Sequence, residues 1–190
     1  MTPFRTRDFR PVAPADRPRR TRDGVRVIVT DGVHVLLFLD TDPGLPGSRW
    51  YVTPGGGIDP GETPADAAVR ELAEETGLVV AASDLVGPVM RRVALHGYSD
   101  QVCAQTEEFY VLRTARFTPD VSGHTADEQL TLAGHAWLPL DALDAADAPV
   151  WPAVLAAALL RANAGGECWE FGLVEESTVP VASAARPREH

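Results

Sequence analysis

The sequence predicts an α/β protein, a sandwich of helices around a mixed β-sheet. Two observations support this fold class. Short runs of β-branched and other apolar residues recur along the chain, and two segments with helical patterning interrupt them. The chain has 190 residues, of which 45% are apolar, so it is large enough to bury the core of one domain.

The first three strands are expected in the first third of the chain. The run VRVIVT over 25–30, the turn dipeptide Asp31-Gly32 and a second strand over 33–39 together predict a hairpin. A loop rich in Gly and Pro then leads to a short strand over 50–52. This strand runs directly into the PGGG sequence at 54–57.

The strongest helix signal follows this glycine loop. Thr63 is expected to cap the helix, with Pro64 at its first position and Asp66 three residues after the cap. Gly77 is expected to end the helix. One face should pack on the sheet and another should carry glutamates: Val69, Leu72, Ala73 and Thr76 form the first, and Glu71, Glu74 and Glu75 form the second.

The rest of the chain adds further strands and one more main helix. The polar stretch between residues 95 and 107 should separate two longer strands. The expected elements are strands over 85–95, 107–117, 135–138 and 168–174, a loop over 118–130, and a helix over 152–162.

The net charge of −10 is unevenly distributed along the chain. Residues 1–26 carry eight arginines against three aspartates, whereas the other 164 residues carry nine arginines against 24 acidic residues. We expect residues 1–22 to be a flexible Arg/Pro-rich arm, residues 23–178 the folded domain, and residues 179–190 a disordered tail. An acidic domain argues against a nucleic-acid groove, because phosphate binding needs a basic surface.

Composition also bears on cellular location. No apolar run approaches the ~20 residues of a membrane helix, and the first residues lack the apolar stretch of a secretory signal. Cys103 and Cys168 form no C-x-x-C pair and are expected to be reduced thiols. We therefore expect a cytoplasmic protein without a membrane partner.

The segment from Gly56 to Leu78 contains the pattern of residues that points to a chemical function. Gly56 is followed by Glu62 after five residues, and after seven more by Arg70-Glu71-Leu72-x-Glu74-Glu75-x-Gly77-Leu78. Glutamates at these spacings on one helix repel one another. A divalent cation with oxygen ligands, such as Mg²⁺, would remove this repulsion. The alternative without function is a solvated acidic face.

This segment matches the Nudix box without a substitution. Trp50 and the PGG at 54–56 resemble the lead-in of the same family, and the looser resemblance extends over roughly 24–145. The resemblance to Nudix (MutT-like) hydrolases implies an α/β/α sandwich around a mixed sheet. It also implies a hydrolase that uses Mg²⁺, or Mn²⁺, and cleaves the pyrophosphate bond of a nucleoside diphosphate-linked substrate with metal-activated water.

The resemblance implies metal-binding roles for the glutamates of the helix. Glu71, Glu74 and Glu75 match the family's metal ligands, and the backbone carbonyl of Gly56 matches a further ligand.

The resemblance also implies catalytic roles around these ligands. Arg70 matches an arginine that orients a glutamate, and its i,i+4 spacing fits an ion pair with Glu74. Glu62 matches an anchor of the loop. The general base is either a glutamate of the helix, such as Glu74, or a loop acid, for which Glu128 is the candidate. A plain loop acid is the alternative for Glu128.

Four further residues are weaker candidates for substrate contacts. Trp50 and Tyr98 could stack on a base, with burial in the protein as the alternative. Arg91 and Arg92 could bind phosphates, with ion pairs to the acidic residues 107–108 of a neighbouring strand as the alternative.

A function from another class stays open. A catalytically silent module that senses a nucleotide or ADP-ribose would share the fold, but such modules usually lose glutamates of the box, and this chain keeps them all. The sequence does not identify the nucleotide. The helix expected over 152–162 fits either the core or the interface of a homodimer.

Overall fold

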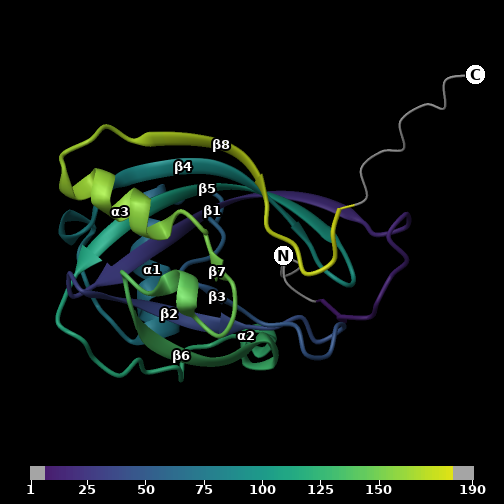
Figure 1. Cartoon of the computed structure of the whole chain (residues 1–190). Coiled ribbons are helices and arrows are strands. Elements are labelled where there is room, and N and C mark those ends of the chain that lie inside the picture. Colours follow the sequence, from purple (N-terminus) through teal and green to yellow (C-terminus); the bar gives the residue numbers. More distant parts are fainter. Residues whose placement is uncertain (1–6, 182–190) are drawn as a thin grey trace, which may run out of the picture.

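A computed structural model describes residues 7–181. Its centre is a mixed eight-stranded sheet in the order β7-β3-β2-β1-β5-β4-β8, with β6 paired to β2 (Figure 1). The strands are β1 Arg19–Thr30, β2 His34–Asp40, β3 Trp50–Val52, β4 Val86–Gly97, β5 Val102–Arg113, β6 Leu132–Pro139, β7 Val150–Trp151 and β8 Trp169–Glu175. The helices are α1 Pro64–Thr76, α2 Ala126–Thr131 and α3 Leu155–Asn163, with short 3₁₀ turns at Ala82–Asp84 and Leu143–Ala145.

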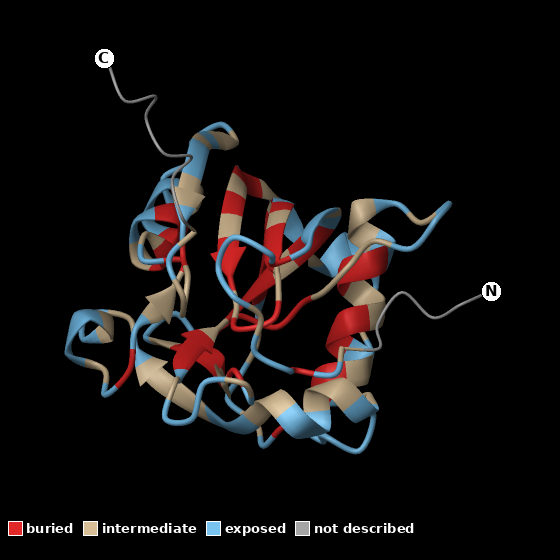
Figure 2. Ribbon diagram, turned by 90° about the vertical axis from the view of Figure 1, so that its right-hand side faces the viewer, coloured by how far each residue is buried: buried red, intermediate tan, exposed pale blue. Residues whose placement is uncertain are grey.

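The sheet has a hydrophobic core on each face. Successive side chains of β1 point to opposite faces, so Val27 packs with Leu72 of α1, whereas Ile28 belongs to the core that contains Leu155 of α3. Figure 2 shows the buried residues gathered in the middle of the molecule. Helices therefore cover both faces of the sheet, and the expected α/β sandwich around a mixed sheet is confirmed.

The caps of α1 agree with the sequence. The Thr63 hydroxyl accepts a hydrogen bond from the Asp66 backbone N–H, and Gly77 ends the helix with a φ of 74°. The predicted packing face is partly wrong, because Ala73 is exposed while Glu71 and Glu75 are buried. The inner face of α1 thus carries two carboxylates as well as apolar side chains.

Residues 7–22 differ from the flexible arm that we expected. Residues 19–22 belong to β1, which pairs in parallel with β5 from Arg19 onward. The Arg17 side chain is buried, and its guanidinium donates to the backbone oxygens of Tyr98, Val179 and Pro180. Segments on both sides of the expected limits of 23 and 178 therefore contact the sheet and the turn between β4 and β5. Residues 1–6 of the expected arm and 182–190 of the expected tail lie outside the described residues.

Other differences are smaller. The expected loop over 118–130 contains the start of α2, and the last helix begins at Leu155, after the short strand β7, instead of at residue 152. Within residues 7–181, no helix is both long and apolar enough to span a membrane.

Candidate active site

The glycine loop after β3 lies directly against α1. The Gly55 backbone N–H donates to Glu75 Oε2 at 2.7 Å. A Cβ atom on Gly56 would stand 2.4 Å from Glu71 Oε1, which is closer than real side chains approach. Only a glycine therefore allows the buried Glu71 carboxylate to sit beside the loop backbone.

Glu71, Glu75 and Glu128 form a carboxylate cluster. Each offers an oxygen within 4.8 Å of the others, and the Glu71 side chain is fully buried. Burial, together with the charge of Glu71, raises the pKa of Glu75 well above its ordinary value. Three carboxylates at this separation repel one another, and an all-oxygen donor set suits a hard divalent cation. The donor set thus fits the Mg²⁺ or Mn²⁺ that the sequence led us to expect.

Glu128 reaches this cluster from α2. Its Oε2 accepts hydrogen bonds from the Thr125 backbone N–H at 2.7 Å and the Thr125 hydroxyl at 2.8 Å, while the Thr125 hydroxyl accepts one from the Glu128 N–H. This reciprocal capping box fixes the side chain at the start of the helix. One carboxylate of the cluster is therefore held by a segment about 50 residues downstream of α1.

Arg70 connects the outer side of α1 to the loop that precedes this helix. Its guanidinium contacts Glu62 at 2.8 Å, Glu71 at 2.9 Å and Glu74 at 3.2 Å, and it donates to the Gly57 carbonyl. The Glu62 hydrogen bond and the neighbouring carboxylates raise the pKa of Arg70. The expected ion pair with Glu74 is present, and Glu62 anchors the loop through the same arginine.

Two of the predicted metal ligands, Glu74 and the Gly56 carbonyl, are not members of this carboxylate cluster. The Glu74 side chain is 41% exposed and pairs with Arg70, outside the group of three carboxylates. The Gly56 carbonyl accepts a hydrogen bond from the Val25 N–H at 2.9 Å, which occupies one of its two lone pairs. Metal binding by Glu74 and by Gly56 stays a prediction.

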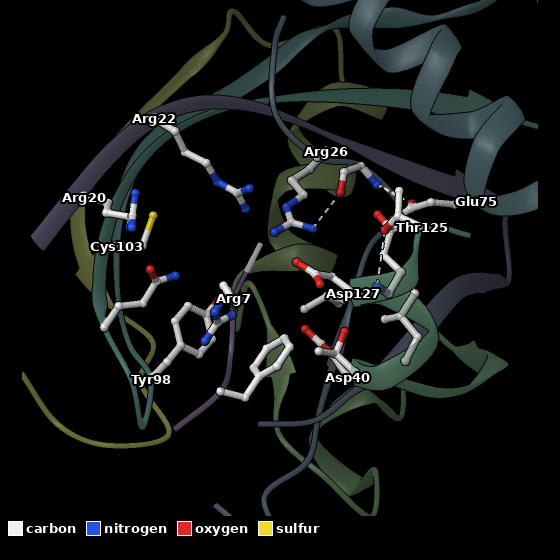
Figure 3. Close-up of a pocket in the computed structure, with 18 of the residues that line it drawn as sticks. Arg7, Arg20, Arg22, Arg26, Asp40, Glu75, Tyr98, Cys103, Thr125 and Asp127 are labelled. Atoms are coloured by element: carbon white, nitrogen blue, oxygen red, sulfur yellow. Dashed lines mark hydrogen bonds between the residues drawn. The ribbon is translucent and has the colours of Figure 1, made fainter. Parts of the chain in front are cut away.

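A pocket of about 200 Å³ opens in front of the cluster. Figure 3 shows its two walls: Arg20, Arg22 and Arg26 lie on one side, and Glu75, Asp127 and Asp40 lie on the other. The arginines all come from one face of β1, because alternate residues of a strand point the same way. An acidic, metal-compatible wall thus faces a basic wall across one pocket.

The arginines of this pocket differ in how strongly other groups hold them. Arg26 contacts Glu107 at 2.9 Å and donates to the Gly55 carbonyl. Arg22 donates to the Gln105 side chain. Arg20 is exposed and makes no ion pair within the described part of the chain. Arg20 and Arg22 therefore carry positive charges that form no direct ion pair with a carboxylate of residues 7–181.

Three of the weaker substrate candidates do not line this pocket. Trp50 is 2% exposed and stacks on Trp151, with 4.9 Å between ring centroids, so no base can reach it. Arg92 is buried between Glu107 at 2.7 Å and Glu176 at 2.8 Å. Arg91 pairs with Glu108 at 3.0 Å, as the strand alternative described.

Tyr98 is the one candidate of this group that lines the pocket. We did not predict Arg20 and Arg22 as site residues, because residues 1–22 were expected to form a flexible arm. The spacing Arg20, Arg22, Arg26 was the available signal, since it follows the two-residue repeat of a strand.

The fold and the site together define an α/β protein with a carboxylate centre of the kind that holds a divalent cation. The NUDIX domain family matches residues 20–159, which is most of the chain. The chain therefore belongs to the Nudix family.

Relatives and solved structures agree with this family. An RNA pyrophosphohydrolase of Brucella anthropi is 32% identical over 137 residues, covering 62% of this chain and 76% of that protein. An RNA pyrophosphohydrolase of Gluconobacter oxydans is 44% identical over 64 residues, covering 34% of this chain and 35% of that protein. A NUDIX hydrolase from Nitrosomonas europaea has a TM-score of 0.52 at 19% identity, covering 78% of this chain and 92% of that one, and shows the same fold.

Proposed function

We propose that the protein is a Nudix pyrophosphohydrolase that cleaves a pyrophosphate bond in a nucleoside diphosphate-linked substrate. Similarity to pyrophosphohydrolases of the family supports this activity. The observation that carries the proposal is the pocket in which Glu75 and Glu128, two of the three clustered carboxylates, face the arginines of β1. A pyrophosphate is a polyanion, so its binding needs cations on more than one side.

Glu71, Glu75 and Glu128 would hold Mg²⁺ or Mn²⁺, with Glu74 and the Gly56 carbonyl as further candidates. When bound, such an ion neutralises phosphate charge and lowers the pKa of a coordinated water. The chain's own part is to fix the carboxylates: Gly55 N–H orients Glu75, Thr125 orients Glu128, and Arg70 orients Glu71. Arg20 and Arg22 would bind the phosphates from the opposite wall.

Proton transfer from the attacking water requires a carboxylate at the pocket. Glu128 is the first candidate for this base, as the alternative to its role as a metal ligand, because Thr125 holds Oε2 and leaves Oε1 to accept the proton. Glu74 is the second candidate from the helix. If Glu128→Gln keeps full turnover and Glu74→Gln is inactive, Glu74 and not Glu128 is the general base.

The substrate class follows from the chemistry of the pocket and from the relatives. We infer a nucleotide with a diphosphate or triphosphate group. A triphosphorylated RNA 5′ end, suggested by the names of the relatives, belongs in the same assay. A cytoplasmic location is also part of the proposal and is supported by the two free cysteines. A homodimer stays a prediction that a sedimentation measurement can check.

Release of phosphate and pyrophosphate tests the proposal. The assay takes nucleoside triphosphates, ADP-ribose, dinucleoside polyphosphates and triphosphorylated RNA, each with Mg²⁺ or Mn²⁺. We expect one class to turn over and Glu75→Gln to lose about 100-fold or more in kcat/KM. Glu167→Gln, which changes an exposed glutamate far along the chain, is the matched control and should match the wild type. Binding of metal and nucleotide without any turnover would instead favour the sensor module.

A further inference from the structure

The pocket has a third group of lining residues, which comes partly from the segment before the matched NUDIX region. Arg7 and Phe9 precede residue 20, and Tyr98 lies in the turn between β4 and β5. The Arg7 Cζ atom lies 4.6 Å from the Phe9 ring centroid and 4.5 Å from the Tyr98 ring centroid. Figure 3 shows Arg7 and Tyr98 on the side of the pocket away from Glu75.

This aromatic wall, as we call Arg7, Phe9 and Tyr98, is fixed in place. Asp100 accepts hydrogen bonds from Arg7 Nε and Nη2, and within residues 7–181 Nη1 of the same guanidinium donates none. The Val12 N–H donates to the Ser99 carbonyl at 2.9 Å. The segment before β1 is therefore bonded to the β4–β5 turn at two points.

The backbone around Phe9 is restricted in its conformation and closely packed. Phe9 has a φ of 51°, in the left-handed region that costs energy for a non-glycine residue. The chain passes so close to Gly44 that a Cβ atom there would stand 2.6 Å from the Phe9 carbonyl oxygen. The surrounding contacts thus hold Phe9, which lines the pocket and is 8% exposed, in one conformation.

The chemistry of the wall differs from that of the other two. Carboxylates and arginines of β1 suit a metal and phosphates, whereas two aromatic rings with a guanidinium between them suit a flat π-system. Asp40 lines the same pocket, on the side of Asp127, and offers a carboxyl group for hydrogen bonds to a polar edge. A nucleobase has both a flat face and a polar edge.

We propose that Arg7, Phe9 and Tyr98 form the nucleobase-binding wall of the pocket, so that the segment before the matched Nudix region selects nucleotides over polyphosphates without a base. This inference rests on the proposed function, because it takes the phosphates to lie between the carboxylates and the β1 arginines. It assigns to residues 7–9 a direct contact with substrate.

Binding and turnover test this wall separately. Nucleoside monophosphates contain no pyrophosphate bond, so their binding can be titrated calorimetrically with Mg²⁺ present and without turnover. We expect the wild type to bind them at least tenfold more tightly than inorganic phosphate. Phe9→Leu keeps apolar volume but removes the ring, and Arg7→Gln removes the cation. Each should weaken monophosphate binding about tenfold, the scale of one lost base stack.

Arg10→Gln is the matched control, since Arg10 is exposed on the same segment and its guanidinium pairs with Asp8. Phe9→Tyr restores a ring and should restore binding. In turnover assays, Phe9→Leu should raise KM for a nucleoside triphosphate and leave hydrolysis of inorganic tripolyphosphate within twofold.

Two outcomes would contradict the proposal that the aromatic wall binds a nucleobase. One is a wild type that binds monophosphates no better than phosphate, and the other is a Phe9→Leu variant that loses tripolyphosphate and nucleotide turnover equally. Base-dependent binding without any turnover would support the wall and contradict the proposed hydrolase, so the two failures are distinguishable.

Discussion

At the scale of single residues, Gly56 shows how a missing side chain makes a site. Its place beside Glu71 leaves no room for a methyl group. We predict that Gly56→Ala displaces the Glu71 carboxylate and weakens Mn²⁺ binding at least tenfold, because the ligands no longer converge. Electron paramagnetic resonance of free Mn²⁺ measures this affinity.

Gly134→Ala provides the matched control for this substitution. Gly134 lies in β6, and an added Cβ there would meet no atom within 4 Å. Mn²⁺ affinity equal to that of the wild type in both alanine variants would contradict the role given to Gly56.

Asp40 is a single residue whose charge should affect stability. Burial raises the pKa of Asp40 to about 6. The folded state then binds a proton more tightly than the unfolded state, so this residue makes the protein less stable as pH rises from about 4 to about 6. We predict that Asp40→Asn is more stable than the wild type above pH 6, by on the order of 1–2 kcal/mol.

Chemical denaturation at several pH values checks this prediction. The difference between Asp40→Asn and the wild type should shrink below pH 4, where both side chains are neutral. Asp141→Asn, at an exposed position, should change stability by less than about 0.5 kcal/mol at every pH. A constant difference across the pH range would show that burial of the Asp40 charge is not its cause.

At the scale of elements, α2 links helix capping to the carboxylate cluster. Thr125 caps the helix and also holds Glu128 Oε2. We predict that Thr125→Ala lowers the free energy of unfolding by about 1 kcal/mol through the lost cap and weakens Mn²⁺ binding severalfold through a looser Glu128. Thr125→Ser keeps the hydroxyl and should retain both properties. If Thr125→Ala lowers stability but leaves the Mn²⁺ affinity unchanged, Glu128 does not contribute to metal binding.

Local and long-range contacts explain which elements the sequence could predict. The caps of α1 and the spacing of Glu71 and Glu75 are local features, and the structure has them where the sequence placed them. The capping box of α2, Thr125 with Glu128, is also local, but we interpreted the polar segment as a loop. The start of β1 depends on parallel pairing with a strand about 80 residues away, and the two-residue spacing of its arginines is a weak local signal for it.

At the scale of the whole molecule, a chain of buried ion pairs joins the C-terminal part to the active site. Glu176 contacts Arg92, which contacts Glu107, which contacts Arg26. Arg26 donates to the carbonyl of Gly55, whose N–H orients Glu75. The segment after β8 thus supports the loop that carries the site.

Glu107 is the centre of this chain, and its removal provides the last prediction. Burial disfavours its charge, but Arg26 and Arg92 outweigh burial and lower the pKa of Glu107 to about 2. The ion pairs therefore add stability above about pH 4.5, and this stability is lost as pH falls toward 2.

Glu107→Gln leaves two buried guanidinium groups without their shared carboxylate, which should cost about 3–5 kcal/mol at pH 7. Glu108→Gln, on the neighbouring and more exposed side chain, should cost less than about 1 kcal/mol. Urea denaturation at pH 7 and pH 4 measures both variants, and equal losses in the two would mean that the chain of ion pairs does not hold the molecule together.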